Sequence, residues 1–113
     1  MKKIYRVVKN EDFSSVVKKG HTLKNDSYTI HYLASELGYS RIGISVSSKL
    51  GHAVVRNKIK RQIRAILDIK IDYTKSSYDI VVIARSGYLE KEFSDNSILL
   101  DNLLSKITGL TNE

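Results

Sequence analysis

The chain has 113 residues, of which 42% are hydrophobic, and it carries a formal net charge of +7 with no cysteine. This length can bury one core without metals or crosslinks, so we expect a single domain over residues 1–113. The lack of cysteine excludes disulfides and thiolate metal sites, and it agrees with a reducing, cytoplasmic setting.

The amino terminus is basic, but no apolar run of signal-peptide length follows it, and the longest apolar run, "IVVIA", is too short to cross a bilayer. We therefore expect no membrane partner. The positive charge is concentrated in residues 41–70, which contain eight Lys or Arg against one acid. Such a local excess favours nucleic acid as a partner, and the alternative is that the basic surface only keeps the protein soluble.

Residues 10–20, "NEDFSSVVKKG", have the pattern of a helix. Asn10 is expected to cap its start, acids lie in the first turn, lysines lie in the last turn, and Gly20 ends it. One face would carry Phe13, Val16 and Val17, and we expect Val16 to lie in the core.

Two strands are expected next. Residues 27–34, "SYTIHYLA", alternate between two faces, and residues 41–48, "RIGISVSS", alternate more clearly. The second strand turns Ile42, Ile44 and Val46 toward a core. Most side chains on its opposite face are small or polar, so another element must cover that face or a ligand must bind on it.

Residues 54–67 are expected to form a helix with two different faces. The core-facing stripe comprises Val55, Ile59, Ile63, Ile66 and Leu67. The opposite side carries Asn57, Lys60, Arg61 and Arg64, with Lys58 further round and Arg56 at the border. Like charges three or four residues apart repel, and none of these basic residues has an acid four positions earlier. The pattern therefore predicts a partner whose phosphates supply the counter-charge.

Residues 79–85, "DIVVIAR", are apolar on both alternating sets, which predicts a central strand covered on both faces. A final helix is expected within residues 94–107, with a core stripe of Leu100, Leu103, Leu104 and Ile107. The order helix, strand, strand, helix, strand, helix predicts an α+β sandwich with a small sheet.

The stretch "RIGISVSSKLGHAVVRNKIKRQIRAIL", followed by "YDIVVIAR", resembles the protein subunit of bacterial ribonuclease P. The signature of that family is an Arg-Asn-Arg type motif in this strand, loop and helix arrangement. The resemblance takes in "KNEDFSSVVKKG" and covers roughly residues 5–107. It implies a two-layer α+β sandwich like the second domain of ribosomal protein S5, with a left-handed strand, helix, strand crossover.

The resemblance also implies an endoribonuclease in which a catalytic RNA, with bound Mg²⁺, removes the 5′ leader from precursor tRNA, so no residue of this chain is expected to be catalytic. The surface for the catalytic RNA would comprise Lys49, Arg56, Asn57, Lys58, Lys60, Arg61 and Arg64. The leader would lie in a cleft between the first helix and the sheet, lined by Phe13, Val17, Thr29, His31 and Ser45. The protein would help the RNA to fold and to bind Mg²⁺.

Three departures from the family pattern are visible. Lys58 stands where the second arginine is usual, so the charge is kept but the planar, two-pronged grip on phosphate is lost. Val17 and His31 replace aromatic residues, so stacking on the leader should be weaker. His52 replaces the usual asparagine after Gly51, which leaves open whether this position caps the helix in the same way.

No metal or acid–base site is indicated, because the three histidines show no ligand spacing and no carboxylate cluster accompanies them. Asp68 and Asp72 could hold a hydrated cation if the helix persists, but we favour solubilising groups. The residues alone also permit a structural RNA-binding protein, such as a small ribosomal protein. A DNA-binding protein that inserts residues 54–67 into the major groove is a weaker alternative, and we expect no DNA partner.

Overall fold

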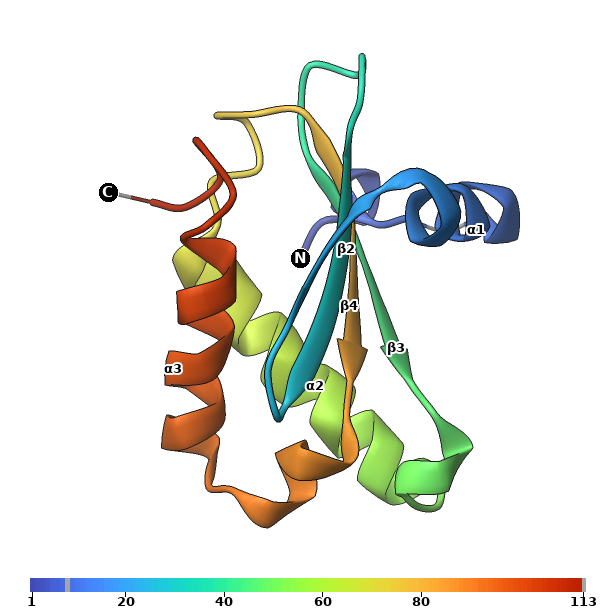
Figure 1. Cartoon of the computed structure of the whole chain (residues 1–113), viewed down its shortest axis with the longest axis vertical. Helices are drawn as coiled ribbons and strands as arrows, with labels where there is room; N and C mark the ends of the chain where they lie inside the picture. Colours follow the sequence, from blue (N-terminus) through green and yellow to red (C-terminus); the bar gives the residue numbers. More distant parts are fainter. Residues whose placement is uncertain (8, 113) are drawn as a thin grey trace.

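The computed structural model describes residues 1–7 and 9–112, and its centre is a four-stranded mixed sheet (Figure 1). The strands are β1 (His21–Lys24), β2 (Tyr28–Ala34), β3 (Arg41–Val46) and β4 (Tyr78–Ala84), and they lie in the order β1-β2-β4-β3. β2 pairs antiparallel with β1 and β4, and β3 pairs parallel with β4.

Helices cover both faces of this sheet. The α-helices are α1 (Asn10–Lys19), α2 (Ala53–Lys70) and α3 (Phe93–Leu104), and short 3-10 helices are η1 (Lys3–Tyr5), η2 (Ser48–Leu50) and η3 (Ser86–Glu90). Figure 1 shows α1 alone on one face and α2 with α3 on the other. The predicted α+β sandwich is confirmed, and α2 connects the parallel strands β3 and β4 as the resemblance implies.

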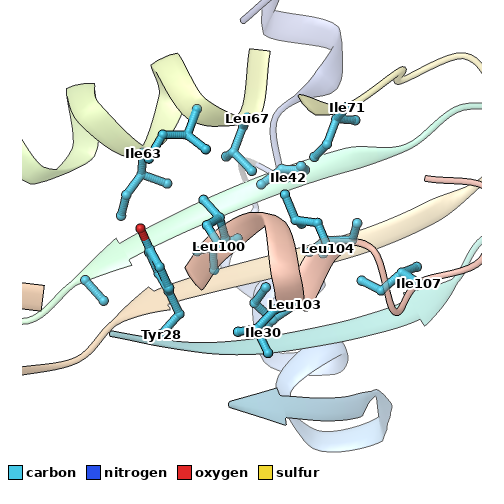
Figure 2. Packing of buried hydrophobic residues seen from close by; sticks show 14 of the residues in the cluster. Tyr28, Ile30, Ile42, Ile63, Leu67, Ile71, Leu100, Leu103, Leu104 and Ile107 are labelled. Carbon is cyan, nitrogen blue, oxygen red and sulfur yellow. The ribbon is translucent and has the colours of Figure 1, made fainter. Parts of the chain in front are cut away.

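The face toward α2 and α3 carries the main core (Figure 2). The core residues predicted for the last helix, Leu100, Leu103, Leu104 and Ile107, are all buried, but α3 ends at Leu104 and Ile107 lies in the turns that follow. β4 lies between two strands, and its apolar residues Ile80, Val81 and Val82 are fully buried, as expected for a central strand covered on both faces.

Two details of α1 and α2 correct the sequence-based expectations. Asn10 is not the cap of α1 but its first helical residue, and the preceding Lys9 makes no side-chain cap. Val55 does not join the core: it is 37% exposed, whereas Ile59, one turn later, is 3% exposed. Val55 lies in the first turn of α2 and packs on the backbone of Gly51 instead of the sheet. A Cβ at position 51 would lie 3.0 Å from Val55 Cβ, and the φ of +146° there also favours glycine.

The strand β1 was not predicted. It is only four residues long, "HTLK", and three of its residues are exposed, so it carries almost no apolar alternation. It forms because it pairs with β2, from His21 opposite Tyr32 to Lys24 opposite Thr29. Within residues 1–7 and 9–112, no helix is both long and apolar enough to span a membrane.

Candidate nucleic-acid interface

α2 distributes the predicted basic residues over more than one surface. Asn57 and Arg61 are exposed on the outer side of the helix. Lys60 and Arg64 are half-buried and line a hollow of about 130 Å³ beside β3. Lys58 lies on the other side of α2 and lines a larger groove next to η3 and α3. The predicted outer group is therefore confirmed only for Asn57 and Arg61, since Lys60 and Arg64 are half-buried in the hollow and Lys58 is separated from both.

The hollow beside β3 gains a further cation that the sequence did not assign. Arg6 lines it together with Lys60 and Arg64. The amino-terminal segment reaches this position because Arg6 forms a parallel bridge with Ile42, in which Val7 N–H donates to the Ile42 carbonyl at 3.1 Å. Among the described residues no acid lines this hollow, so three cationic side chains lie around one small concavity.

The predicted RNA-binding residues are not neutralised within the described part of the chain. None of Lys49, Arg56, Lys58, Lys60, Arg61 or Arg64 forms a salt bridge there. Arg56 is half-buried at the border of the two faces, as predicted, and its Nε–H is buried without a hydrogen-bond partner among the described residues.

The start of α2 resolves the question about its cap. Lys49 is exposed on η2, whose first backbone amides are capped by the Ser47 hydroxyl, 3.2 Å from the Lys49 nitrogen. His52 occupies the N-cap position of α2, but its side chain makes no capping hydrogen bond. The histidine therefore does not replace an asparagine cap, and the first turn of α2 keeps free backbone N–H groups.

The opposite face of the sheet brings the predicted leader-binding residues together. Thr29 and Ser45 both lie opposite Ile83 of β4, so these three half-buried residues form one row across the sheet, here called the open row. In the next row, His31 and Gly43 lie opposite Val81. The Thr22 hydroxyl lies 3.0 Å from His31 Nδ1.

α1 lies beside the open row. The ring of Phe13 covers Gly43, where a Cβ would come within 2.6 Å of Phe13 Cε2. Phe13 is half-buried, Val17 is 39% exposed, and Val16 is buried beneath the helix, as predicted. The small, polar face expected for β3 is thus covered at Gly43 and left partly accessible at Ser45.

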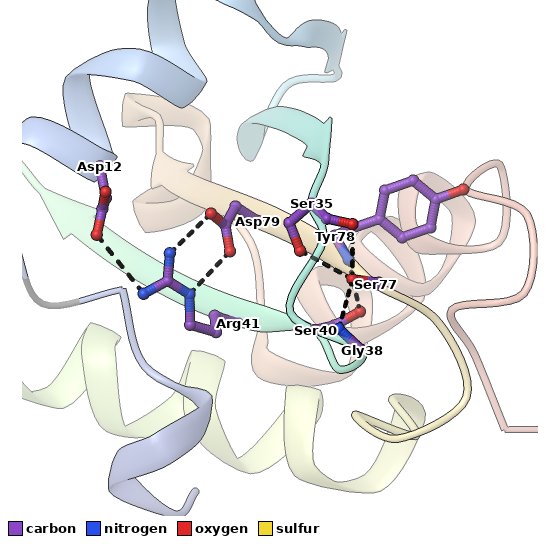
Figure 3. A network of polar contacts seen from close by, with 8 residues as sticks. All are labelled: Asp12, Ser35, Gly38, Ser40, Arg41, Ser77, Tyr78 and Asp79. Atoms are coloured by element: carbon purple, nitrogen blue, oxygen red, sulfur yellow. Dashed lines mark hydrogen bonds and ion pairs between the residues drawn. The ribbon is translucent and has the colours of Figure 1, made fainter.

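A polar network holds α1 over the sheet (Figure 3). Arg41 donates to both carboxylate oxygens of Asp79 on the neighbouring strand, at 2.9 and 2.8 Å, and lies 3.5 Å from the Asp12 carboxylate of α1. The hydrogen bonds to Asp79 raise the pKa of Arg41 above its usual value. The two-pronged pair links β3 to β4 and orients the Arg41 guanidinium, which then reaches Asp12 of α1.

Asp68 of α2 and Asp72, which follows the helix, each have a hydrogen-bond partner within the chain. The helix ends at Lys70, before Asp72, and Asp68 accepts from the amino-terminal ammonium of Met1 at 2.9 Å. Asp72 accepts from the Thr74 hydroxyl, which lowers the pKa of that carboxyl. The described residues contain no group of three or more His, Cys, Asp or Glu side chains that could hold a metal ion.

Comparisons with known proteins agree with this geometry. The family model for Ribonuclease P matches residues 1–108. The chain is 44% identical over 110 residues to a ribonuclease P protein component of Streptococcus agalactiae, covering 97% of this chain and 99% of that protein. A ribonuclease P protein component of Geobacillus kaustophilus is 44% identical over 112 residues, covering 97% and 92%.

Solved structures give the same result. An RNase P protein structure from Staphylococcus aureus has a TM-score of 0.83 at 36% identity and covers 93% of this chain and 96% of that one. The RNase P protein from Thermotoga maritima has a TM-score of 0.78 at 35% identity, with 92% and 98% covered. These matches span nearly the whole chain, so the chain belongs to the ribonuclease P protein family.

Proposed function

We propose that this ribonuclease P protein component binds two RNAs with two separate surfaces. One surface, on α2 and the adjoining η2, binds the catalytic RNA of the enzyme. The other, the open row with α1 beside it, binds the 5′ leader of precursor tRNA. The observation that carries the proposal is that these basic and polar surfaces lie on opposite faces of one sheet, so both can be occupied at once.

The catalytic-RNA surface consists of Lys49, Arg56, Asn57, Lys58, Lys60, Arg61 and Arg64. Support for it comes from charge: the six cations have no acidic partner within the described chain, so phosphates would supply the counter-charge and release condensed cations on binding. Arg6, which shares the hollow of Lys60 and Arg64, extends this surface.

The leader surface consists of Phe13, Val17, Thr29, His31 and Ser45. Ile83 of β4 lies between Thr29 of β2 and Ser45 of β3. A half-buried aromatic ring beside short hydroxyl side chains suits a single strand, whose bases can stack while its sugars and phosphates accept hydrogen bonds. Val17 offers no ring and the His31 imidazole lies 3.0 Å from the Thr22 hydroxyl, so Phe13 is the main stacking group in this proposal.

The catalytic step in this proposal belongs to the RNA, with its Mg²⁺, as the resemblance to the ribonuclease P protein family implies. The chain contributes binding: it positions the leader of the precursor beside the RNA that cleaves it. It thereby favours precursor over mature tRNA and lowers the Mg²⁺ concentration that the RNA needs to fold.

Reconstitution tests this function. The catalytic RNA of the same organism is incubated with precursor tRNA at low Mg²⁺, with and without the full chain, and the released leader is measured. We expect cleavage to be stimulated by the chain. Unchanged cleavage would contradict the proposal, and co-purification with ribosomal subunits in that case would favour a structural RNA-binding protein.

A further inference from the structure

A groove lies between the first turns of α2 and the start of α3, and of the residues assigned to the two proposed RNA surfaces only Lys58 lines it. It has a volume of about 510 Å³. Its apolar lining comes from Val54 and Val55 of α2, from Leu89 of η3 and from Phe93, the first residue of α3. Lys58 and Lys91 also line it, together with one acid, Glu92.

The apolar lining is unusually accessible for a protein of this charge. Val54 is 82% exposed, Leu89 50% and Phe93 46%. Exposed apolar side chains are common singly, but several that line one concavity mark a binding site. The volume is several times that of one nucleobase, which leaves room for a base with its sugar.

The walls of the groove are held in place by buried hydrogen bonds. Asn96 Nδ2 donates to the Tyr88 carbonyl at 3.0 Å, and the Tyr28 hydroxyl donates to the Asn96 carbonyl at 2.8 Å. The Tyr88 hydroxyl donates to Gln62 Oε1 at 2.7 Å. The amide nitrogen of Gln62 then has no protein acceptor within the described chain and can donate to a ligand.

The charges point to a nucleic acid as the occupant. Lys58 has no acidic partner among the described residues, whereas Lys91 lies 3.9 Å from an Asp26 carboxylate oxygen. Lys58 belongs to α2, whose Asn57 and Arg61 are exposed next to it, so an RNA bound along this helix passes the mouth of the groove. A second copy of this chain is a poor occupant, because it would bring the same lysines and a net charge of +7.

We infer that this groove holds an unpaired nucleotide of the catalytic RNA, whose base packs on Phe93, Leu89 and Val54 while its phosphate lies beside Lys58. The inference rests on the proposed function, since it assigns a specific contact to the same RNA partner. It also explains why a lysine suffices at position 58: a single phosphate at the rim of a groove needs a point charge and not a planar fork.

The test measures the affinity of the full chain for the full-length catalytic RNA. Phe93→Ala should weaken binding about tenfold if a base stacks on the ring. Lys58→Ala should weaken it and reduce the salt slope by about one unit. Glu92→Gln should tighten binding about twofold, because it removes the one acid of the groove. Ile69→Ala is the matched control, since Ile69 is also exposed on α2 but lies outside the groove.

Base-specific chemical probing of the catalytic RNA gives a direct readout. We expect an unpaired base to be protected by the unaltered chain and by Ile69→Ala, and to become reactive again with Phe93→Ala. Thermal melting of each variant checks that it is folded. Equal affinities for Phe93→Ala and Ile69→Ala, with no change in protection, would overturn the inference.

The outcomes separate this inference from the proposed function. If the unaltered chain neither binds nor stimulates the catalytic RNA, the proposed function fails. If it does both while Phe93→Ala behaves like the control, only the groove assignment fails, because Phe93 belongs to neither proposed RNA surface. Sedimentation of the free chain addresses a second copy: self-association that Phe93→Ala abolishes, with RNA affinity unchanged, would also overturn the inference.

Discussion

The two faces of the sheet are built in different ways. The face toward α2 and α3 is closed by fully buried side chains such as Ile63 and Leu104. The face toward α1 is held by the buried side chain of Val16, by the Arg41 ion pairs and by the Phe13 ring packed on Gly43, and it leaves the open row partly accessible. The first face supplies stability through burial, which lets the second remain polar and available for a ligand. Substitutions on the two faces should therefore have different consequences.

The largest expected effect is on the closed face. Leu104→Ala should lower the free energy of unfolding by about 2–5 kcal/mol, because Leu104 is fully buried and the cavity would not be filled. Urea denaturation measures this. The matched control is Leu37→Ala, at an exposed position, which should change the free energy by less than about 0.5 kcal/mol. A loss below about 1 kcal/mol for Leu104→Ala would show that this face is not the source of stability.

On the α1 face, Phe13→Ala should weaken binding of precursor tRNA relative to mature tRNA by about 1–3 kcal/mol, since stacking on a leader base would be lost. The holoenzyme affinities for the two tRNAs measure it. Phe13→Leu serves as the control, because it keeps an apolar contact with Gly43 but has no ring. Equal losses for both tRNAs would show that Phe13 only packs on the sheet.

Arg41 lies between Asp79 of β4 and Asp12 of α1, so a change at Arg41 should affect the stability of α1 more than that of the other helices. Arg41→Lys loses the two-pronged hydrogen bond to Asp79, so we expect a loss of about 1 kcal/mol of stability and faster amide exchange in α1 than in α3. Hydrogen exchange of the free chain checks this. Lys70→Ala removes a looser surface pair, 3.9 Å from Asp101, and should have little effect. Uniform acceleration in all helices would contradict a local role.

The smallest expected effects concern single phosphate contacts on α2. Arg61→Ala and Arg64→Ala should each flatten the salt dependence of catalytic-RNA binding by about one unit and leave the preference for precursor over mature tRNA unchanged. Titrations at several salt concentrations measure the slope. A change in that preference without a change in slope would place these arginines on the leader surface instead.

Much of this architecture follows from local patterns. The regular spacing of apolar residues predicted the helices α1, α2 and α3 and the strands β2, β3 and β4. The spacing is visible because each of these elements buries one or both of its faces. The short β1 has no such period and exists only because β2 offers it an edge. Val55 was wrongly predicted to lie in the core for a related reason. Periodicity predicts which side of a helix faces the sheet, but it does not predict how far along the helix the sheet extends.

The sequence by itself determined the chemistry of this protein: an excess of cations on one helix and a polar face on one strand. Tertiary structure alone decided the partners of those side chains. It placed Arg6 beside Lys60 and Arg64, set Lys58 over an apolar groove, and aligned Thr29 with Ser45 across β4. The physical reason is that these contacts join residues far apart in the chain, and strand register and helix docking determine them, not local sequence.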